Sequence, residues 1–133
     1  MNMVQVDHFA FHVHDMDASI AFYRDIVGLK LLSRDIDEDH AEEFAFMELD
    51  GGNLELLANR GEKGSTSGDT KGKESNGAHL AFSTNDIDAV VMDLREKGVD
   101  DIEGPFTITK KVKWLYFKDP DGNMLEYVQW MDE

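Results

Sequence analysis

The sequence contains no cysteine among its 133 residues. A chain without cysteine has no disulfide scaffold, no thiolate-ligated metal and no cysteine nucleophile. Long apolar runs are also missing, and none approaches the length of a membrane span. No apolar stretch follows the N-terminus as it does in a secretion signal. We therefore expect a cytoplasmic protein that does not insert into a membrane.

Basic residues are scarce, with 13 Lys and Arg against 28 Asp and Glu, so the formal net charge is −15. An excess of negative charge disfavours binding to nucleic acid and to anionic membranes, and we expect neither partner. The acidic residues predict a solvated surface and do not by themselves indicate a metal site. The length and the hydrophobic content of 41% predict one globular domain spanning residues 1–133.

An internal repeat appears when the sequence is shifted by 71 residues. Between residues 8 and 24, seven of 17 positions are then identical, where about one identity is expected from ordinary residue frequencies. The same shift places the Asp50-Gly51 and Leu54-Glu55 pairs over Asp121-Gly122 and Leu125-Glu126. The two halves therefore repeat one structural plan.

The hydrophobic pattern of each half predicts a strand, a helix and three further strands. Asp15 or Asp17 is expected to cap the first helix, and Asp86 or Asp88 the second. Gly28 and Gly98 follow the last helical turns, as helix-ending glycines do. The predicted strands are 6–13, 31–36, 43–49 and 53–58 in the first half, and 78–84, 99–108, 112–118 and 124–130 in the second.

We therefore predict an α+β fold of two tandem βαβββ modules, residues 1–59 and 78–133. Residues 60–77 contain five glycines, three serines, two threonines and no apolar side chain. This composition cannot pack into a core and predicts a flexible linker between the modules. Whether the linker becomes ordered when a ligand binds is left open.

Four residues form a symmetric set of candidate metal ligands, because the repeat relates His8 to His79 and Glu55 to Glu126. Side chains alternate between the two faces of a strand, so each of the four is predicted to lie opposite its apolar neighbours. A buried carboxylate needs a cationic partner or must take up a proton. One divalent ion would serve both glutamates, and mixed nitrogen and oxygen ligands suit Ni, Co, Zn, Mn or Fe(II) better than Ca.

The remaining histidines are weaker candidates. His12 shares a face with His8 but lies four residues further along the strand, about 13 Å away. It is predicted to line a pocket and not to bind the metal. His14 and His40 are expected on the surface.

These features resemble the vicinal oxygen chelate superfamily, and within it glyoxalase I (lactoylglutathione lyase). The resemblance covers nearly the whole chain outside the linker. It is carried by the segments Asp7-His8-Phe9-Ala10-Phe11, Ile20-Ala21-Phe22-Tyr23 to Gly28-Leu29, Leu54-Glu55-Leu56, Ala78-His79-Leu80-Ala81-Phe82 and Asp119-Pro120-Asp121-Gly122-Asn123 to Glu126. It implies that two βαβββ modules of mixed and antiparallel sheet form a metal-binding cup.

For activity, the resemblance implies isomerisation of the hemithioacetal of glutathione and methylglyoxal. Glu126 would act as the base and Glu55 as the second carboxylate. It also implies a homodimer in which each site combines the N-terminal module of one chain with the C-terminal module of the other. The compact chain with a His as its first ligand is more similar to the nickel- and cobalt-preferring kind than to the longer zinc-dependent kind.

Recognition of glutathione is only partly supported by the residues present. The family's glutathione-binding arginine is replaced by His12, and a basic residue of some members is replaced by Ser75. Asn59 matches a glutathione-contacting asparagine. Lys110, with Lys111 and Lys113 nearby, falls where relatives use lysine against a carboxylate, although a solvated strand edge explains these lysines equally well.

Other functions within the superfamily stay open. An acyl-CoA epimerase uses a four-ligand site, whereas antibiotic thiol transferases and extradiol dioxygenases usually show three protein ligands, so Glu55 counts against the latter two. A non-catalytic small-molecule binding protein typically lacks the metal ligands, which are all present here.

Overall fold

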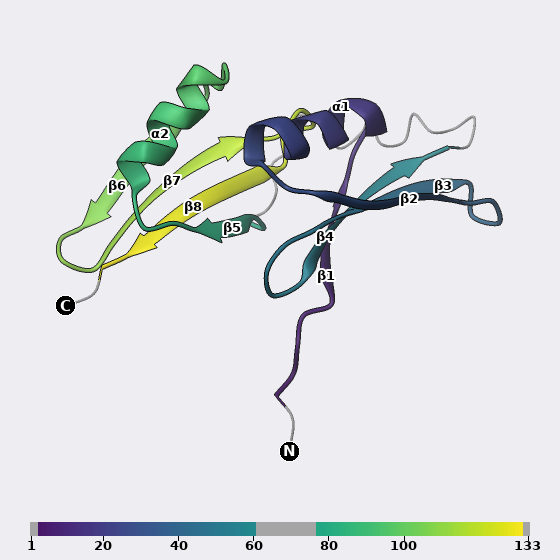
Figure 1. The fold of residues 1–133 in the computed structure, drawn as a ribbon, viewed down its shortest axis with the longest axis horizontal. Helices are drawn as coiled ribbons and strands as arrows, with labels where there is room; N and C mark the ends of the chain where they lie inside the picture. Colours follow the sequence, from purple (N-terminus) through teal and green to yellow (C-terminus); the bar gives the residue numbers. More distant parts are fainter. Residues whose placement is uncertain (1–2, 61–76, 132–133) are drawn as a thin grey trace. The chain divides into compact units, whose positions relative to one another are not determined.

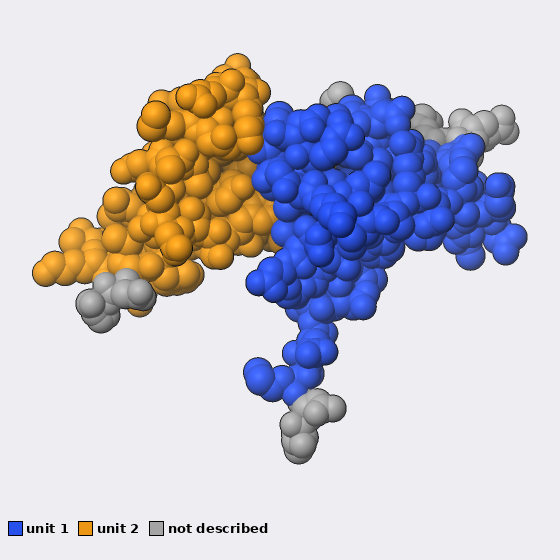
Figure 2. All heavy atoms as spheres, viewed as in Figure 1, with its two compact units in different colours: residues 1–73 blue, residues 74–133 orange. Residues whose placement is uncertain are grey.

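The computed structural model describes residues 3–60 and 77–131. Two compact units make up the chain, residues 1–73 and residues 74–133, shown in blue and orange in Figure 2. The predicted linker falls almost wholly on residues 61–76, outside the described residues, so it stays a prediction.

The first unit contains a four-stranded sheet and one helical segment (Figure 1). The strands lie in the order β1-β4-β3-β2, with β1 parallel to β4 and the other pairs antiparallel. The elements are β1 (His8–His12), α1 (Met16–Ala21), a π-helical turn η1 (Phe22–Val27), β2 (Leu31–Asp37), β3 (Glu42–Met47) and β4 (Asn53–Asn59).

The second unit repeats this topology with the strand order β5-β8-β7-β6, in which β5 is parallel to β8. Its elements are β5 (Leu80–Ser83), α2 (Ile87–Glu96), β6 (Glu103–Ile108), β7 (Val112–Lys118) and β8 (Met124–Trp130). The predicted α+β fold of tandem βαβββ units is therefore confirmed. The strand expected over residues 78–84 is shorter than predicted, so His79 lies just before β5.

Each sheet has one face covered by its helix, which we call the helix face. In the second unit, the side chain of Gln129 on β8 accepts a hydrogen bond from the backbone N–H of Ile87 on α2. The fully buried apolar residues belong to this side of each sheet and to the helix above it, and they form the two cores: Val13, Ile20, Tyr23, Ala45, Met47, Leu54 and Leu56 in the first unit, and Ile87, Leu94, Leu115, Phe117 and Leu125 in the second. Burying one large apolar side chain contributes about 1.5–3 kcal/mol.

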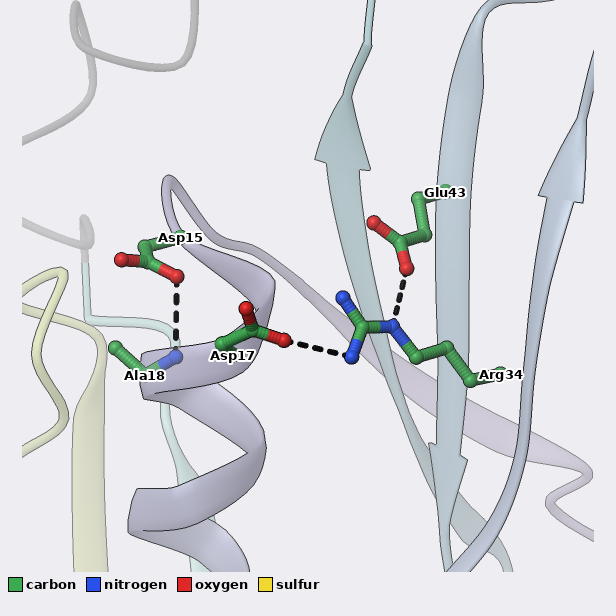
Figure 3. Close-up of polar contacts among 5 residues, drawn as sticks. All are labelled: Asp15, Asp17, Ala18, Arg34 and Glu43. Atoms are coloured by element: carbon green, nitrogen blue, oxygen red, sulfur yellow. Dashed lines mark hydrogen bonds and ion pairs between the residues drawn. The ribbon is translucent and has the colours of Figure 1, made fainter.

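Asp15 caps the first helix, since its carboxylate accepts a hydrogen bond from the N–H of Ala18 at 3.1 Å (Figure 3). The other candidate, Asp17, has a different role. Its carboxylate lies 2.7 Å from the guanidinium of Arg34 on β2, which also pairs with Glu43 on β3 (Figure 3). Asp15 therefore caps the helix, and Asp17 attaches the helix to the sheet through Arg34.

The first helix changes its hydrogen-bonding pattern before it ends. After α1 the chain forms the π-helical turn η1, which sequence periodicity did not predict. Gly28 ends this turn with φ of 93°, and the N–H groups of Gly28 and Leu29 both donate to the carbonyl of Tyr23. Left-handed backbone of this kind favours glycine, so the predicted role of Gly28 is confirmed. Within the described ranges, no helix is long and apolar enough to cross a membrane.

Candidate metal centre

Each unit brings one histidine and one glutamate together on the face away from its helix, which we call the site face. In the first unit, Glu55 on β4 lies opposite Ala10 on β1, two residues after His8. In the second unit, Glu126 on β8 lies opposite Ala81 on β5, two residues after His79. The same diagonal relation in two parallel strand pairs gives the two units equivalent His–Glu pairs.

The atoms that face each other are the histidine Nε2 and the glutamate Oε1. They are 3.3 Å apart in the His8–Glu55 pair and 2.8 Å apart in the His79–Glu126 pair. Both carboxylates are largely buried, with side chains 14% and 13% exposed. A carboxylate removed from water to this extent needs a proton or a cation beside it.

The second nitrogen of each imidazole is held by a partner of its own. His79 Nδ1 lies 2.8 Å from the carbonyl oxygen of Gly77, and His8 Nδ1 lies 2.7 Å from the carboxylate of Asp7. Both partner atoms are oxygen acceptors for an Nδ1–H group, so these contacts orient each ring with Nε2 toward the glutamate. Asp7 also raises the pKa of His8 above its usual value, chiefly through this hydrogen bond and then, with Glu55, through its charge.

A divalent cation fits this donor set. Two acceptors that face each other at about 3 Å repel unless a proton or a cation lies beside both. Nitrogen and oxygen ligands about 2.0–2.2 Å from an ion are about 3 Å apart when adjacent in an octahedral shell. Orienting a ligand imidazole through Nδ1 is also the usual arrangement at metal sites.

The four-ligand set itself is not assembled among the residues that the structure describes. In residues 3–60 and 77–131, no three or more His, Asp or Glu side chains come together as a metal-binding group. Two donors meet in each unit, and the combination of both pairs around one ion stays a prediction.

The predicted substrate-contacting residues lie in different places. His12 ends β1 opposite Leu57, and Asn59 ends β4, so by alternation both belong to the site face of the first sheet. Lys110 lies in the β6–β7 turn with φ of 63°. Lys113 is opposite Gln129, which bonds to α2, so Lys113 belongs to the helix face, away from Glu126. His40 pairs with Asp37 at 2.9 Å near the β2–β3 turn.

Each pair also packs against an aromatic ring that sequence reasoning missed. Phe46 lies opposite Glu55 and meets His8 edge-on, with ring centroids 5.5 Å apart. Tyr116 lies opposite Glu126 and meets His79 in the same way at 5.6 Å. The sequence repeat did not reveal that Phe46 and Tyr116 are equivalent, because they are 70 residues apart and the repeat has an offset of 71. The pairing of the strands shows the equivalence.

The chain thus consists of two tandem βαβββ units, each with a His–Glu pair on its site face. The family model described as the Glyoxalase/Bleomycin resistance protein/Dioxygenase superfamily matches residues 5–127. The chain belongs to this superfamily, as the sequence resemblance indicated.

Relatives with different names resemble the chain to a similar degree. It is 27% identical over 132 residues to human mitochondrial methylmalonyl-CoA epimerase, covering 96% of this chain and 75% of that protein. It is 28% identical over 134 residues to a protein of Vibrio cholerae described as a probable lactoylglutathione lyase, covering 97% and 93%. Among solved structures, TnmS3, an antibiotic-binding protein from Streptomyces sp. CB03234, matches with a TM-score of 0.72, 24% identity and 98% of each chain, which supports the fold alone.

Proposed function

We propose that the chain is a divalent-metal-dependent lyase or isomerase of the glyoxalase I type. It would convert the hemithioacetal of a 2-oxoaldehyde and a thiol, such as methylglyoxal and glutathione, into a 2-hydroxyacyl thioester. The observation that carries the proposal is the pair of oriented imidazoles, each with Nε2 within 3.3 Å of a buried carboxylate. Membership of the superfamily and the similarity to a probable lactoylglutathione lyase support it.

In this proposal, His8, Glu55, His79 and Glu126 hold one divalent ion. Nickel or cobalt is favoured, and zinc, manganese or iron also suits these donors. When bound, the ion supplies Lewis-acid stabilisation of the negative charge that develops on the substrate oxygens. The two pairs come from a single chain or from two chains of a homodimer.

The chain's own residues carry the proton transfer. The carboxylate of Glu126 takes a proton from the carbon that bears the hydroxyl group and returns it to the neighbouring carbonyl carbon, while the hydroxyl proton passes to the former carbonyl oxygen, so that atoms and charge balance. Glu55 serves as the second carboxylate. Burial of both side chains, with Phe46 and Tyr116 opposite them, limits the access of water to the carboxylates. His12, Asn59 and Lys110 are the proposed contacts for the thiol part of the substrate.

An acyl-CoA epimerase is the second candidate, favoured by the similarity to human methylmalonyl-CoA epimerase over 96% of this chain. Epimerisation also removes a proton from a carbon next to a carbonyl, which is a thioester carbonyl in an acyl-CoA and the 2-oxo group in the hemithioacetal, so the two candidates differ in substrate recognition. A thiol transferase, a dioxygenase or a non-catalytic binding protein is less well supported, because two His–Glu pairs supply more ligands than those functions usually use.

The deciding experiment measures turnover by protein stripped with chelator and reloaded with nickel, cobalt or zinc. Formation of lactoylglutathione from methylglyoxal and glutathione is expected to require the metal and to be lost in Glu126→Gln. Glu43→Gln is a matched control, because Glu43 is equally buried but pairs with Arg34 on the helix face. Absence of lactoylglutathione with every metal, together with racemisation of an acyl-CoA, would move the assignment to the epimerase. Size-exclusion chromatography tests the expected homodimer.

A further inference from the structure

A row of aromatic rings occupies the site face of the second sheet. It begins beside His79, whose ring meets Tyr116 at 5.6 Å. Phe106 on β6 follows, with its ring centroid 6.3 Å from that of Tyr116 and 5.6 Å from that of Trp114. A continuous line of rings therefore leads from a candidate metal ligand across β7 and β6. We call Tyr116, Phe106 and Trp114 the aromatic row.

The aromatic row belongs to the face that α2 leaves uncovered. Trp114 and Tyr116 alternate along β7 with Leu115 and Phe117, which are buried in the core. Phe106, the ring between Tyr116 and Trp114 in the row, is 43% exposed, and on the same face Trp130 is 63% exposed. Large apolar side chains held next to a polar pair are typical of a surface that binds an apolar group.

The backbone beneath the row favours this placement of Phe106. Gly104 has φ of 102°, and a Cβ atom added there would lie 3.1 Å from the ring of Phe106 and 3.1 Å from the carbonyl oxygen of Trp114. A side chain at this position would displace the ring. The glycine therefore allows the ring to lie close against the strand beside Trp114.

The first unit has a shorter row beside its equivalent His–Glu pair: His8 meets Phe46 with ring centroids 5.5 Å apart, and Phe46 meets Phe44 at 6.0 Å. Asp35 lies opposite Phe44 at the register position that Phe106 holds opposite Trp114. Asn59 stands where the repeat places Trp130 in the second unit. The two site faces thus share a His–Glu pair with two neighbouring rings, and they differ at the adjoining strand, which places Asp35 in the first unit where the second has Phe106.

We propose that the aromatic row binds an aryl group that the substrate carries next to its reacting carbons. The chain would then prefer aryl-substituted 2-oxo or 2-hydroxyacyl compounds over methyl-substituted ones. This inference rests on the proposed function for the position of the reacting carbons beside His79 and Glu126. An aryl group fits better than an alkyl chain because ring–ring contacts add an attraction beyond burial of apolar surface.

The test compares mandelate with lactate, which share a carboxylate and an adjacent hydroxyl and differ only in phenyl against methyl. Isothermal titration of the nickel-loaded protein is expected to give a Kd about tenfold lower for mandelate. The same titrations on chelator-treated protein are expected to keep this ratio at weaker overall affinity. A protein that binds no nickel but keeps the ratio would contradict the proposed function and leave the aryl site standing.

Variants of Phe106 separate an aromatic contact from general apolar contact. Phe106→Leu is expected to lower the preference for mandelate about fivefold without changing the Kd of lactate, and Phe106→Trp is expected to retain the preference. Met92→Leu, at an exposed apolar residue of α2, is the control and should change neither Kd.

Three results would overturn the inference. The first is equal affinity for the two acids, and the second is failure of either acid to bind although nickel is bound. The third is an unchanged preference in Phe106→Leu. Loss of a dimer in Phe106→Leu with the preference unchanged would assign the face to contact between two copies of the chain.

Discussion

If both His–Glu pairs bind one shared ion, the thermal stability of the protein should rise by a calculable amount when the metal is bound. At a free nickel concentration of 100 times Kd, binding only to the folded state stabilises the protein by about 2.7 kcal/mol. For a chain of this length, that corresponds to a rise in Tm on the order of 10 °C. The metal-dependent rise in Tm therefore measures the occupancy of the site without an activity assay.

Glu55→Gln and Glu126→Gln are each expected to abolish most of this rise. Each replacement removes one of two donors in its unit and one of two negative charges beside the ion. Loss of an outer partner of a ligand already costs about 10–100-fold in affinity, so loss of a ligand is expected to cost at least about 100-fold. At unchanged nickel concentration, the stabilisation then falls to about 0.4 kcal/mol.

Differential scanning fluorimetry with and without nickel measures the effect, and elemental analysis gives the metal content, expected at one ion per chain. Glu43→Gln should lower Tm equally in both conditions, since Glu43 pairs with Arg34 and not with a histidine. Two ions per chain, with each single variant retaining about half of the metal-dependent rise, would refute sharing of one ion. An undiminished rise in both variants would refute the choice of ligands.

Three further predictions concern individual residues. In metal-free protein, NMR titration should show a His8 pKa above its usual value, and Asp7→Asn should lower that pKa. Because protonated His8 is favoured in the folded state, wild type should be more stable than the variant below about pH 6.5. This difference in stability should disappear as the pH rises through the folded-state pKa of His8. Asp15→Ala and Asp86→Ala each remove a helix cap and should lower the free energy of unfolding by about 1 kcal/mol in urea titrations; no change in either variant would contradict the capping roles. Gly28→Ala should cost about 1–2 kcal/mol through its left-handed backbone alone, since no atom outside its neighbours lies within 4 Å of the added Cβ; a stabilised variant would contradict this account.

The repeat made most of the fold predictable from the sequence. The offset of 71 residues, the alternating apolar positions and the glycines after the helices located nearly every element, and the structure confirms the βαβββ order in both units. The same repeat selected the two His–Glu pairs, and the structure places each pair in contact. The alternation of side chains along a strand predicts the face of one sheet on which a residue lies. It therefore could not predict whether both pairs bind one ion.

Other features were not predictable because they depend on contacts remote in sequence. The spacing of apolar residues does not distinguish the π-helical turn η1 from an α-helical one over so short a segment. Asp15 and Asp17 both suit a cap, and the choice depends on Arg34 approaching from β2. The aromatic row depends on the pairing of β6 with β7, and Lys113 on the face that Gln129 occupies.

The parallel pairing of the first and last strand in each unit has a consequence for folding. His8 on β1 meets Glu55 on β4 only after the helix and the two intervening strands have been made, and His79 beside β5 depends on β8 in the same way. The two paired strands are separated by nearly the whole unit in sequence, so their pairing closes the longest loop and has the largest entropic cost. We therefore expect this pairing to form late in folding. A nascent chain would therefore offer no complete donor pair, and uptake of the ion would mark the end of folding and not its beginning.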